Sequence, residues 1–467
     1  MNFFMNKHRK KLIWGIDGLP ELVCKDKRLF DSVDALIGGD KSLQGNMLLG
    51  KPVLNYDIIL QTCDRPFILL ANQDNTKARQ FLRCHGYIEE VDFCEVSELF
   101  SAGETKRLES ERQVRRTKKE LLIAFIFDHG YGIGDTIIMR SAYDAILSLA
   151  PTAKVDFFCA DSIGRECVEV FYGNSSNLNR IYKEREFNRL INEYAVVIRG
   201  ARWLKIAKLD EFLLKLKTPK LLSALKKVQE FNKLYFREWN NVVLRNVTLS
   251  HILGLNDYTC LGGGALPIKT QHVALPLWEE AKPRFNQLNL GNYYCTITVG
   301  SGCIEGLRQV KEWPNEYLER YIGLLKRSFP NLQVVQLSGQ SESALKNADV
   351  CLRGEDLRVV EHVLSNSLLH IGTEGGLIHL ASQFRTKCAV IFGPTDPAYY
   401  AYSNNINIRA DICSPCFGTW LDSSHCVRGF DVDPPCMRAV TPEMVFDKTK
   451  YFLSMKIKER AGMRELR

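Results

Sequence analysis

Residues 365–408 constrain the fold of this chain more than any other stretch. An apolar strand pattern over 368–372 leads into the glycine turn TEGG at 373–376, and a helix pattern begins at Leu377. A second apolar run, over 388–392, ends in the proline-bounded loop GPTDP. A strand, a glycine turn and a helix in this order expose backbone N–H groups and a helix N-terminus, which together suit an anion such as a phosphate.

The side chains of this turn favour the same interpretation. His379 falls within about one helical turn of the start of the helix, where its imidazole could reach a bound anion. Glu374 lies in the turn itself, and the two glycines after it let a ligand approach the backbone closely. Ligands of open α/β sheets bind at the carboxyl ends of the strands. We therefore predict an anion site formed by Glu374, Gly375, Gly376 and His379.

A second strand, glycine loop and helix lie at 121–149. The run LLIAFIFD at 121–128 is typical of a strand buried on both faces, and a helix pattern over 136–149 follows the loop HGYGIGD. Asp135 stands at the junction, beside glycines. Its carboxylate could act as a general base, or it could simply cap the helix. The spacing alone leaves both roles open.

Further polar positions follow strand patterns in the second part of the chain. Lys311 comes just before a helix pattern over 315–328, where a lysine can meet a pyrophosphate as a compact charge or lie unused on the surface. Residues 339–342, with Gly339 and Gln340 as the candidates, follow a strand pattern over 333–337 and could hydrogen-bond a ribose or the edge of a base.

The order of these elements predicts an α/β fold with two similar halves, joined near 262–283 and facing a cleft in which a ligand would bind.

Residues 1–100 alternate short apolar runs with turn signals and are expected to form a small Rossmann-like module of their own. Its segment WGIDG at 14–18 lacks the G-x-G-x-x-G fingerprint, so we expect a structural or docking role there. The predicted boundaries are 1–100 for this accessory module, 101–120 for a charged linker, 121–285 and 286–440 for the two halves, and 441–467 for a C-terminal helix.

A lysine-rich helical pattern covers 204–240. Leu, Phe and Ile alternate there with Lys at helical spacing, which indicates either a solvated amphipathic helix or a patch that contacts a membrane surface.

Four of the fifteen cysteines gather in a loop-rich segment at 413–436. Their spacing is C-x2-C-x9-C-x9-C. Four thiolates can satisfy tetrahedral zinc or iron and so order such a loop, whereas the alternatives are reduced structural thiols or a redox pair. The candidate ligands are Cys413, Cys416, Cys426 and Cys436.

Charge and hydropathy exclude some classes of function. A net charge of +8 over 467 residues is a mild excess, far from the signature of a nucleic-acid-binding protein. The basic N-terminus is followed by an apolar segment too short for a secretory signal, and no stretch approaches the roughly 20 apolar residues of a membrane span. We therefore expect a cytoplasmic protein, with contact to the inner membrane limited to its surface.

From Leu121 onward the chain resembles glycosyltransferase family 9, the ADP-heptose:lipopolysaccharide heptosyltransferases and their relatives. The resemblance depends on short motifs in a specific order: Gly134-Asp135, KEWP at 311–314, EGGLIHLA at 374–381, FGPT at 392–395, and a tail with CM at 436–437 and VTPE at 440–443.

This resemblance implies a GT-B fold, in which two Rossmann-like halves face a cleft and the donor nucleotide binds the C-terminal half. It also implies an inverting transfer without a catalytic metal. Asp135 would deprotonate the acceptor hydroxyl, while the departing nucleoside diphosphate would be stabilised from the other half. The donor-binding residues carried over are Ser301, Gly302, Lys311, Glu374, Gly375, Gly376 and His379.

The expected function is therefore that of a glycosyltransferase, which moves a sugar from a nucleotide-sugar donor, with ADP-heptose favoured, to a lipopolysaccharide core or a related surface glycan. The acceptor would be a glycan or glycolipid. Two departures leave the donor sugar open: Glu374-Gly375-Gly376 stands where the family commonly has Asp-Thr-Gly, and the loop after Gly300 is longer than in the family. The alternatives are a protein O-glycosyltransferase of the same fold and a non-catalytic scaffold that binds nucleotide sugars. The oligomeric state is left open.

Overall fold

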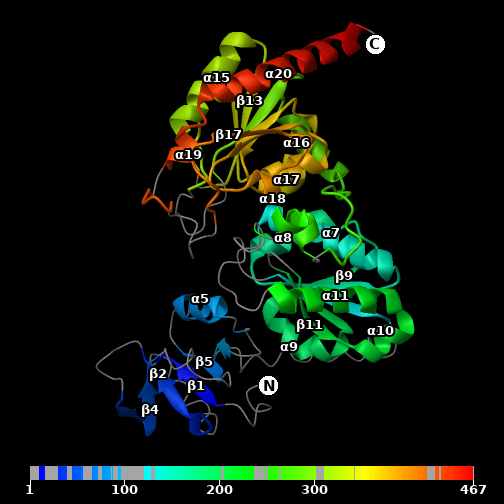
Figure 1. Ribbon diagram of the computed structural model, residues 1–467, viewed down its shortest axis with the longest axis vertical. Coiled ribbons are helices and arrows are strands. Elements are labelled where there is room, and N and C mark those ends of the chain that lie inside the picture. The colour runs from blue at the N-terminus through cyan, green and yellow to red at the C-terminus, as the bar shows by residue number, and fades with distance from the viewer. Residues whose placement is uncertain are drawn as a thin grey trace. The chain divides into compact units, whose positions relative to one another are not determined.

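The structure is a computed structural model, and its described residues form two compact units (Figure 1). One comprises Met1–Leu121 with Tyr182–Tyr194, and the other comprises Leu122–Ile181 with Ala195–Arg467. The described residues are 10–15, 30–38, 45–55, 66–71, 76–85, 87, 93–95, 120–127, 132–200, 204–235, 248, 251–261, 264–300, 310–340, 342–417, 426–430 and 433–465. The predicted linker, apart from Glu120, lies outside them.

The first unit contains a six-stranded sheet in the order β3-β4-β2-β1-β5-β6. Its pairs are parallel except for β3 with β4. Buried residues such as Leu12, Ile68 and Phe93 form its core together with Leu82 of the helix. The α/β module expected at the start of the chain is therefore confirmed. Its elements are β1 (Lys11–Trp14), β2 (Ala35–Ile37), β3 (Met47–Leu48), β4 (Lys51–Leu54), β5 (Phe67–Leu70), α5 (Thr76–Cys84) and β6 (Phe93–Glu95).

A short segment from later in the chain belongs to this first unit. It holds η2 (Glu184–Glu186), α9 (Phe187–Leu190) and η3 (Ile191–Glu193). A guanidinium nitrogen of Arg83 on α5 lies 3.8 Å from the carboxylate of Glu184, which is nearly buried. No pattern in the sequence predicts this long-range association.

The second unit begins with a five-stranded sheet in the order β11-β10-β7-β8-β9. Every residue of β7 is buried, as its continuous apolar run predicts. Because β8 lies on one side of β7 and β10 on the other, the strand order reverses at β7, and ligands of such sheets bind at that point. The helix α7 (Ile133–Leu149) follows β7 at this position. The strands are β7 (Leu122–Phe127), β8 (Lys154–Cys159), β9 (Leu178–Lys183), β10 (Val196–Gly200) and β11 (Leu204–Leu209).

The helix expected over 204–240 is wrong in its first part. Residues LKIAKL form the strand β11, which pairs antiparallel with β10, and two helices follow, α10 (Glu211–Lys217) and α11 (Pro219–Tyr235). The alternation of apolar and lysine residues suits an edge strand, Asp210 caps α10, and Pro219 opens α11. Tertiary pairing thus overrode the helical periodicity.

A six-stranded parallel sheet forms the C-terminal half, in the order β14-β13-β12-β15-β16-β17. The order reverses between β12 and β15, so the loops after these two strands lie at the expected binding edge. The strands are β12 (Tyr294–Thr298), β13 (Gln333–Ser338), β14 (Val350–Arg353), β15 (His370–Thr373), β16 (Cys388–Phe392) and β17 (Ile406–Arg409).

Helices cover this sheet (Figure 1). The helices α15 (Asn315–Ser328) and α20 (Pro442–Glu465) pack together, and their apolar faces join the core of the sheet. The helices α16 (Leu357–Asn366) and α17 (Gly376–Gln383) also pack against each other. The predicted fold class, two Rossmann-like α/β halves with an extra module before them, is therefore confirmed. Further helices of this unit are α8 (Ser162–Tyr172), α13 (Asp257–Cys260), α18 (Pro397–Tyr400) and α19 (Pro435–Arg438). Among the helices in the described part, none is long and apolar enough to cross a bilayer.

Candidate functional site

The N-termini of α7 and α17, one from each half, pack directly against each other. A Cβ added to Gly376 would lie 2.9 Å from Cβ of Ile133 and 3.1 Å from the backbone nitrogen of Gly134. Only glycine permits this approach. Within the described residues, neither helix has a side chain that caps its first N–H groups. Two positive helix ends therefore meet, which suits an anion.

Asp135 lies in the first turn of α7, and it is half-buried. The helix begins at Ile133, three residues earlier than the apolar pattern predicts, with Gly132 as its N-cap. Capping was one of the two roles open to Asp135, and this geometry excludes it as the N-cap residue. Its charge acts on His379, whose pKa it helps to raise. The structure thus brings the predicted base to the predicted anion site.

The ring of His379 is buried and fixed on two sides. Its Nδ1 lies 2.8 Å from the hydroxyl of Tyr402. A Cβ on Gly134 would lie only 2.9 Å from Cδ2 of the same ring, so the imidazole packs against the bare backbone of α7. The remaining nitrogen, Nε2, lies 3.8 Å from Oε1 of Glu374, which is the distance of an ion pair rather than of a hydrogen bond.

Glu374 holds two cations together. The ammonium of Lys311 donates a hydrogen bond of 3.2 Å to its Oε2, while His379 faces its other oxygen. Burial alone would raise the pKa of this carboxyl, but the charges of Lys311 and His379 outweigh burial and hold the pKa below its usual range. Glu374 is therefore ionised at neutral pH, and it positions two cationic groups beside the start of α17.

The protonation of His379 depends on the same balance. Burial would lower its pKa, but the carboxylates of Glu374, Asp257 and Asp135 together outweigh burial and raise the pKa above its ordinary value. An imidazolium and an ammonium at a helix N-terminus form a site for a doubly charged anion. Of the predicted donor-binding residues, the structure thus brings Lys311, Glu374 and His379 into one cluster, with Gly375 and Gly376 at its base.

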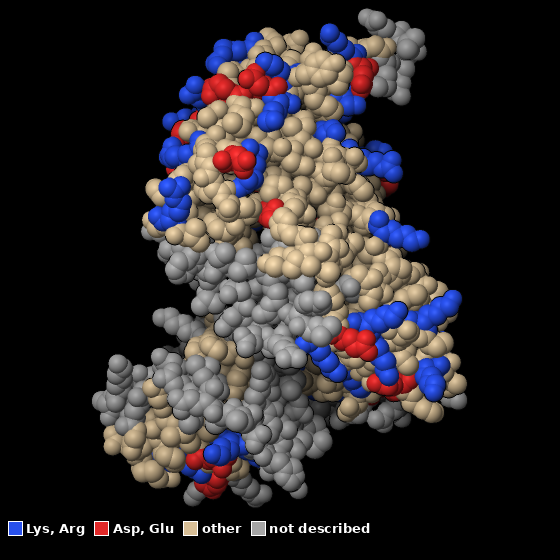
Figure 2. Space-filling view, in the orientation of Figure 1, with Lys and Arg blue, Asp and Glu red and all other residues tan. Residues whose placement is uncertain are grey.

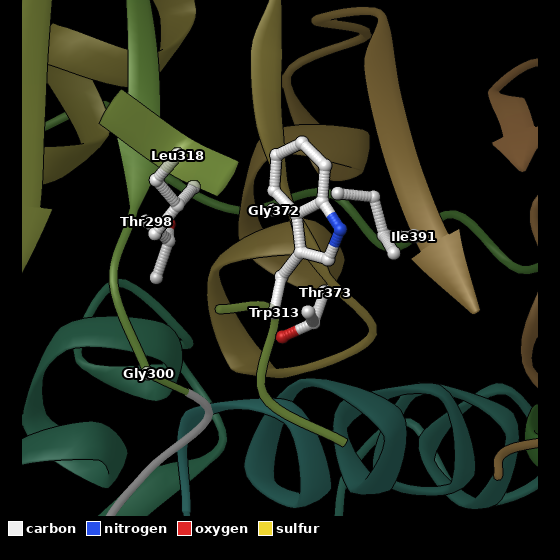
Figure 3. Close-up of a pocket in the computed structure, with 7 residues that line it drawn as sticks. All are labelled: Thr298, Gly300, Trp313, Leu318, Gly372, Thr373 and Ile391. Atoms are coloured by element: carbon white, nitrogen blue, oxygen red, sulfur yellow. The ribbon is translucent and has the colours of Figure 1, made fainter. Parts of the chain in front are cut away.

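A small, narrow pocket lies at the carboxyl ends of β12, β15 and β16, where the order of the strands reverses (Figure 3). Figure 3 shows the indole of Trp313 between Leu318 and Ile391, with the hydroxyl of Thr373 beside it. The lining residues of the pocket are Thr298, Gly300, Trp313, Leu318, Gly372, Thr373 and Ile391.

Two motifs that carried the family resemblance meet at Trp313. Its indole nitrogen donates a hydrogen bond of 2.8 Å to the backbone oxygen of Val440, so the motif KEWP is tied to the motif VTPE. Trp313 is buried and lies edge-on to Tyr317 and Tyr321 of α15. The tail motif therefore supports the loop that carries Lys311.

Glu342 ends the stretch 339–342, for which the sequence predicts hydrogen bonds to a ribose or to the edge of a base. Its carboxylate accepts a hydrogen bond of 3.3 Å from the backbone N–H of Gly339, and it lies so close to Gly300 that a Cβ there would come within 2.4 Å of it. Burial raises the pKa of this carboxyl to about 7. Glu342 thus stands at the carboxyl edge of β12 and β13, where acidic side chains bind ribose hydroxyls in nucleotide-binding sheets.

The other predicted donor-binding residues have different outcomes. Gly339 follows β13, and Gln340 next to it points its amide at Gly354, where a Cβ would lie 2.3 Å from Oε1. Among the described residues, neither forms a hydrogen bond or an ion pair with the cluster around Glu374. Ser301 and Gly302 lie outside the described residues.

A hydrogen-bonded group behind His379 was also missed. The hydroxyls of Tyr258 and Tyr402 lie 2.6 Å apart, and the amide of Gln383 donates to both, at 3.1 and 3.2 Å. Tyr258 belongs to α13 in the N-terminal half. Short-range sequence patterns could not reveal this pair, because 144 residues separate the two tyrosines.

The cysteines of residues 413–436 lie near one another. Cys426 and Cys436 are buried, and Cys413 and Cys416 are half-buried, all as thiols. Burial and the three neighbouring thiols raise the pKa of Cys436 to about 12. Yet within the described residues no group of three or more His, Cys, Asp or Glu side chains is arranged to hold a metal ion. The four thiols gather without forming a ligand set, and the metal stays a prediction.

Comparison with known proteins gives structural likenesses only. The chain matches no family model and no curated protein. Similar solved structures include ADP-heptose lps heptosyltransferase II from E. coli, with 14% identity and a TM-score of 0.47 over 72% of this chain and 99% of that one. A glycosyl transferase family 9 protein from Veillonella parvula has 13% identity and a TM-score of 0.44, over 72% of this chain and 98% of that one.

A third similar structure is the iron-containing dodecameric glycosyltransferase TibC from enterotoxigenic E. coli, with 15% identity and a TM-score of 0.45 over 72% of this chain and 76% of that one. Proteins of glycosyltransferase family 9, the family that the motifs resemble, are thus among the solved structures to which the chain is similar. At these identities the likeness concerns the fold, and the roles of individual residues rest on their geometry.

Proposed function

We propose that this chain is an inverting glycosyltransferase that moves a sugar from a nucleoside diphosphate to a hydroxyl of a glycan or glycolipid. One observation carries the proposal: the packing of α7 on α17 brings the carboxylate of Asp135 to a cluster that holds Lys311 and His379 as cations. A displacement reaction needs a base for the attacking hydroxyl and a group that stabilises the leaving anion. The base candidate of one half and the anion site of the other match these two needs.

The chemistry follows from these positions. Asp135 accepts the proton of the acceptor hydroxyl, whose oxygen forms a bond to the anomeric carbon of the sugar. The bond between that carbon and the diphosphate oxygen breaks, and its electron pair leaves with the nucleoside diphosphate. Lys311, His379 and the N–H groups of α17 stabilise the charge that develops there. A single displacement inverts the anomeric centre, and the charge stabilisation comes from the chain itself.

ADP-heptose is the donor we propose first, because the motifs of the chain resemble those of the ADP-heptose-dependent family. Glu342 supports a nucleotide donor, since its carboxylate can accept hydrogen bonds from the hydroxyls of a ribose bound at the end of β13. A lipopolysaccharide core or a related surface glycan is the proposed acceptor. The turn at Gly375, where the family commonly has threonine, is one of two places where the sequence departs from the family, the other being a longer loop after Gly300, and it bears on which sugar is accepted.

Two accessory features remain predictions. Phe212 and Leu216 of α10 are 83% and 75% exposed, which suits contact with a membrane surface. Figure 2 shows acidic as well as basic side chains where α10 and α11 lie in Figure 1, and Lys226 pairs with Glu211 at 2.6 Å, which is typical of a solvated surface. Sedimentation with anionic vesicles distinguishes a surface that contacts a membrane from one that is only solvated.

Structural zinc or iron at Cys413, Cys416, Cys426 and Cys436 is the second accessory feature. It is excluded if elemental analysis of the purified protein finds neither metal.

The function is tested by mass spectrometry of purified protein incubated with a panel of nucleotide sugars and acceptor extracts. We expect release of a nucleoside diphosphate together with a product heavier by one sugar. Hydroxyl-bearing peptides in the same panel test for a protein O-glycosyltransferase. Binding of a nucleotide sugar by calorimetry with no product from any acceptor would instead indicate a non-catalytic binding protein, which the altered turn at Gly375 makes the second candidate.

A further inference from the structure

Two buried tyrosine hydroxyls, one from each half, meet directly behind the ring of His379. Tyr258 belongs to α13 and Tyr402 follows α18, and the two residues are 0% and 2% exposed. Their hydroxyl oxygens lie 2.6 Å apart, and the hydroxyl of Tyr402 lies 2.8 Å from Nδ1 of His379. Because such burial shields the hydroxyls from solvent, each of their protons needs an acceptor within the protein.

The amide of Gln383 takes neither of these protons, because its orientation is fixed. Its Oε1 accepts a hydrogen bond of 2.8 Å from the backbone N–H of Val273, which can only donate. The amide nitrogen therefore points the other way. There it donates to the backbone oxygen of His379 at 2.9 Å and to the hydroxyls of Tyr258 and Tyr402 at 3.1 and 3.2 Å. Both hydroxyls thus face a donor on this side.

A count of protons then fixes the direction of the bonds in this group. The contact between the two hydroxyls uses one of their two protons, so the other needs a further acceptor. Among the described residues, Nδ1 of His379 is the one acceptor left within hydrogen-bond reach, and Tyr402 is the tyrosine that reaches it. Tyr258 therefore donates to Tyr402, and Tyr402 donates to Nδ1. This chain needs an Nδ1 without a proton, so the neutral ring carries its proton on Nε2.

Nε2 of His379 is the ring nitrogen on the side of the candidate site. It lies 3.8 Å from Oε1 of Glu374, whose other oxygen accepts the hydrogen bond of Lys311. A Cβ built on Gly134 would lie 3.5 Å from Nε2, so this nitrogen also stands at the contact between the starts of α7 and α17. A proton on Nε2 therefore lies beside the cluster that suits an anion.

The charge of the ring leaves the proton on Nε2 in place. Burial lowers the pKa of His379, but the carboxylates of Glu374, Asp257 and Asp135 together outweigh burial and raise it. When the ring gains its second proton, that proton enters at Nδ1 and Tyr402 turns to accept it. One of the two hydroxyl protons then has no acceptor among the described residues. In both forms the ring donates toward the cluster through Nε2.

We propose that Tyr402 is a positioning residue: by its hydrogen bond to Nδ1 it holds the ring of His379 so that the Nε2–H meets the diphosphate of the donor. Tyr258 completes the chain from the N-terminal half, so a contact between the two halves orients a group of the donor site. The direction of the hydrogen bonds follows from the structure alone, whereas the contact with a diphosphate rests on the proposed function.

The direction of the chain is tested by NMR of protein isotope-labelled at histidine, at a pH where the ring of His379 is neutral. The signals of this ring are identified by their loss in His379→Gln. We expect a proton on Nε2 and a hydrogen-bonded Nδ1 in the wild type, and an Nδ1 without a hydrogen bond in Tyr402→Phe. A proton on Nδ1 in the wild type would overturn the proposal, as would an unaltered Nδ1 signal in Tyr402→Phe.

Two further variants separate this hydrogen bond from a general change in the fold. Tyr258→Phe removes the hydroxyl one step further from the ring, and Nδ1 should stay hydrogen-bonded because Tyr402 still donates to it. The matched control is Tyr294→Phe on β12, which removes a buried hydroxyl that donates to the backbone oxygen of Val363 at 2.8 Å. It should leave the signals of His379 as in the wild type. A loss of the hydrogen bond at Nδ1 in either variant would contradict the assignment.

Two substitutions of His379 test which ring nitrogen meets the anion. The amide nitrogen in His379→Gln stands as many bonds from the backbone as Nε2 does, whereas in His379→Asn it stands as many as Nδ1. We expect His379→Gln to bind ADP about tenfold more tightly than His379→Asn, the difference made by one charge-assisted hydrogen bond. Equal affinity, or tighter binding by His379→Asn, would overturn the role of Nε2.

Calorimetry with ADP also measures the contribution of Tyr402. We expect Tyr402→Phe to weaken ADP binding by about three- to tenfold, the range of one buried hydrogen bond, while Tyr294→Phe binds as the wild type does. Wild-type affinity in Tyr402→Phe would overturn its role in positioning the ring. If the wild type binds no ADP although the NMR signals are as expected, the proposed function fails while the direction of the hydrogen bonds stands.

Discussion

The starts of α7 and α17 have the same backbone arrangement but carry different side chains. Each follows a buried parallel strand at the point where its sheet reverses order, and each has a glycine as N-cap. On α7 the first turn carries a carboxylate, Asp135, whereas on α17 it carries His379, whose pKa the nearby carboxylates raise against the effect of burial. Under the proposed function, the two similar turns differ by one side chain each, which is a base on α7 and a group that meets the diphosphate on α17.

The glycines of the two turns also divide into pairs. Gly134 and Gly376 have no room for a Cβ, because each faces the other helix. Gly132 and Gly375 have room: among the described atoms, a Cβ on Gly132 meets nothing within 4 Å and one on Gly375 meets only a backbone oxygen at 3.8 Å. Packing between the halves therefore requires one glycine in each turn. Substitutions in the turns can separate effects on this packing from effects on binding and turnover.

Replacing Asp135 with Asn should have the largest effect. Turnover should fall by about 10²–10⁴-fold, the usual contribution of a general base, while ADP binding stays within a few-fold of the wild type. The matched control is Asp144→Asn on the same helix, whose carboxylate pairs with Arg140 at 2.8 Å, and this variant should retain turnover. Wild-type turnover in Asp135→Asn would show that α7 does not carry the base.

Gly376→Ala should separate the two helices. The new methyl group would lie 2.9 Å from Cβ of Ile133 and 3.1 Å from a backbone nitrogen, and neither atom can move without its helix. Overpacking of this kind costs about 1–3 kcal/mol, so we expect a lower free energy of unfolding together with a loss of ADP binding. Denaturant unfolding and calorimetry measure the two effects. A stable variant that binds ADP normally would show that the halves need not touch here.

The sequence predicts the elements of these turns well and their partners poorly. The helix over 315–328 and the strand over 388–392 have the expected bounds, because apolar periodicity is a local property. The start of α7 was placed three residues late, since Gly132 and Gly134 interrupt that periodicity. Tyr258 and Tyr402 were missed for a different reason: their hydroxyls meet beside His379 only through packing between distant segments, which no pattern along the chain records.

Gly134→Ala should affect the site more than the fold. Its methyl group would meet the ring of His379 at 2.9 Å, and Tyr402 holds that ring in place. Alanine gains up to about 1 kcal/mol over glycine within a helix, which offsets part of the clash. We therefore expect a free energy of unfolding within about 1 kcal/mol of the wild type but ADP binding about tenfold weaker, the loss expected when one charge-assisted contact is displaced. The control is Gly132→Ala, where the methyl group has room, and there ADP binding should be unchanged. Equal binding in the two variants would contradict the contact between Gly134 and His379.

Gly375→Ser should have the smallest effect, and it should be favourable. Gly375 is the N-cap of α17, its backbone is extended, with φ of 170°, and a side chain fits there. A serine hydroxyl could accept a hydrogen bond from the first turn of the helix, so we expect a gain of a few tenths of a kcal/mol in the free energy of unfolding. The same hydroxyl stands where the resembling family carries threonine. The donor preference of the variant, measured with the panel of nucleotide sugars, therefore separates a role in the helix from a role in donor binding. An unchanged donor preference would mean that the missing hydroxyl affects only the helix, whereas a changed one would place Gly375 against the sugar or the diphosphate.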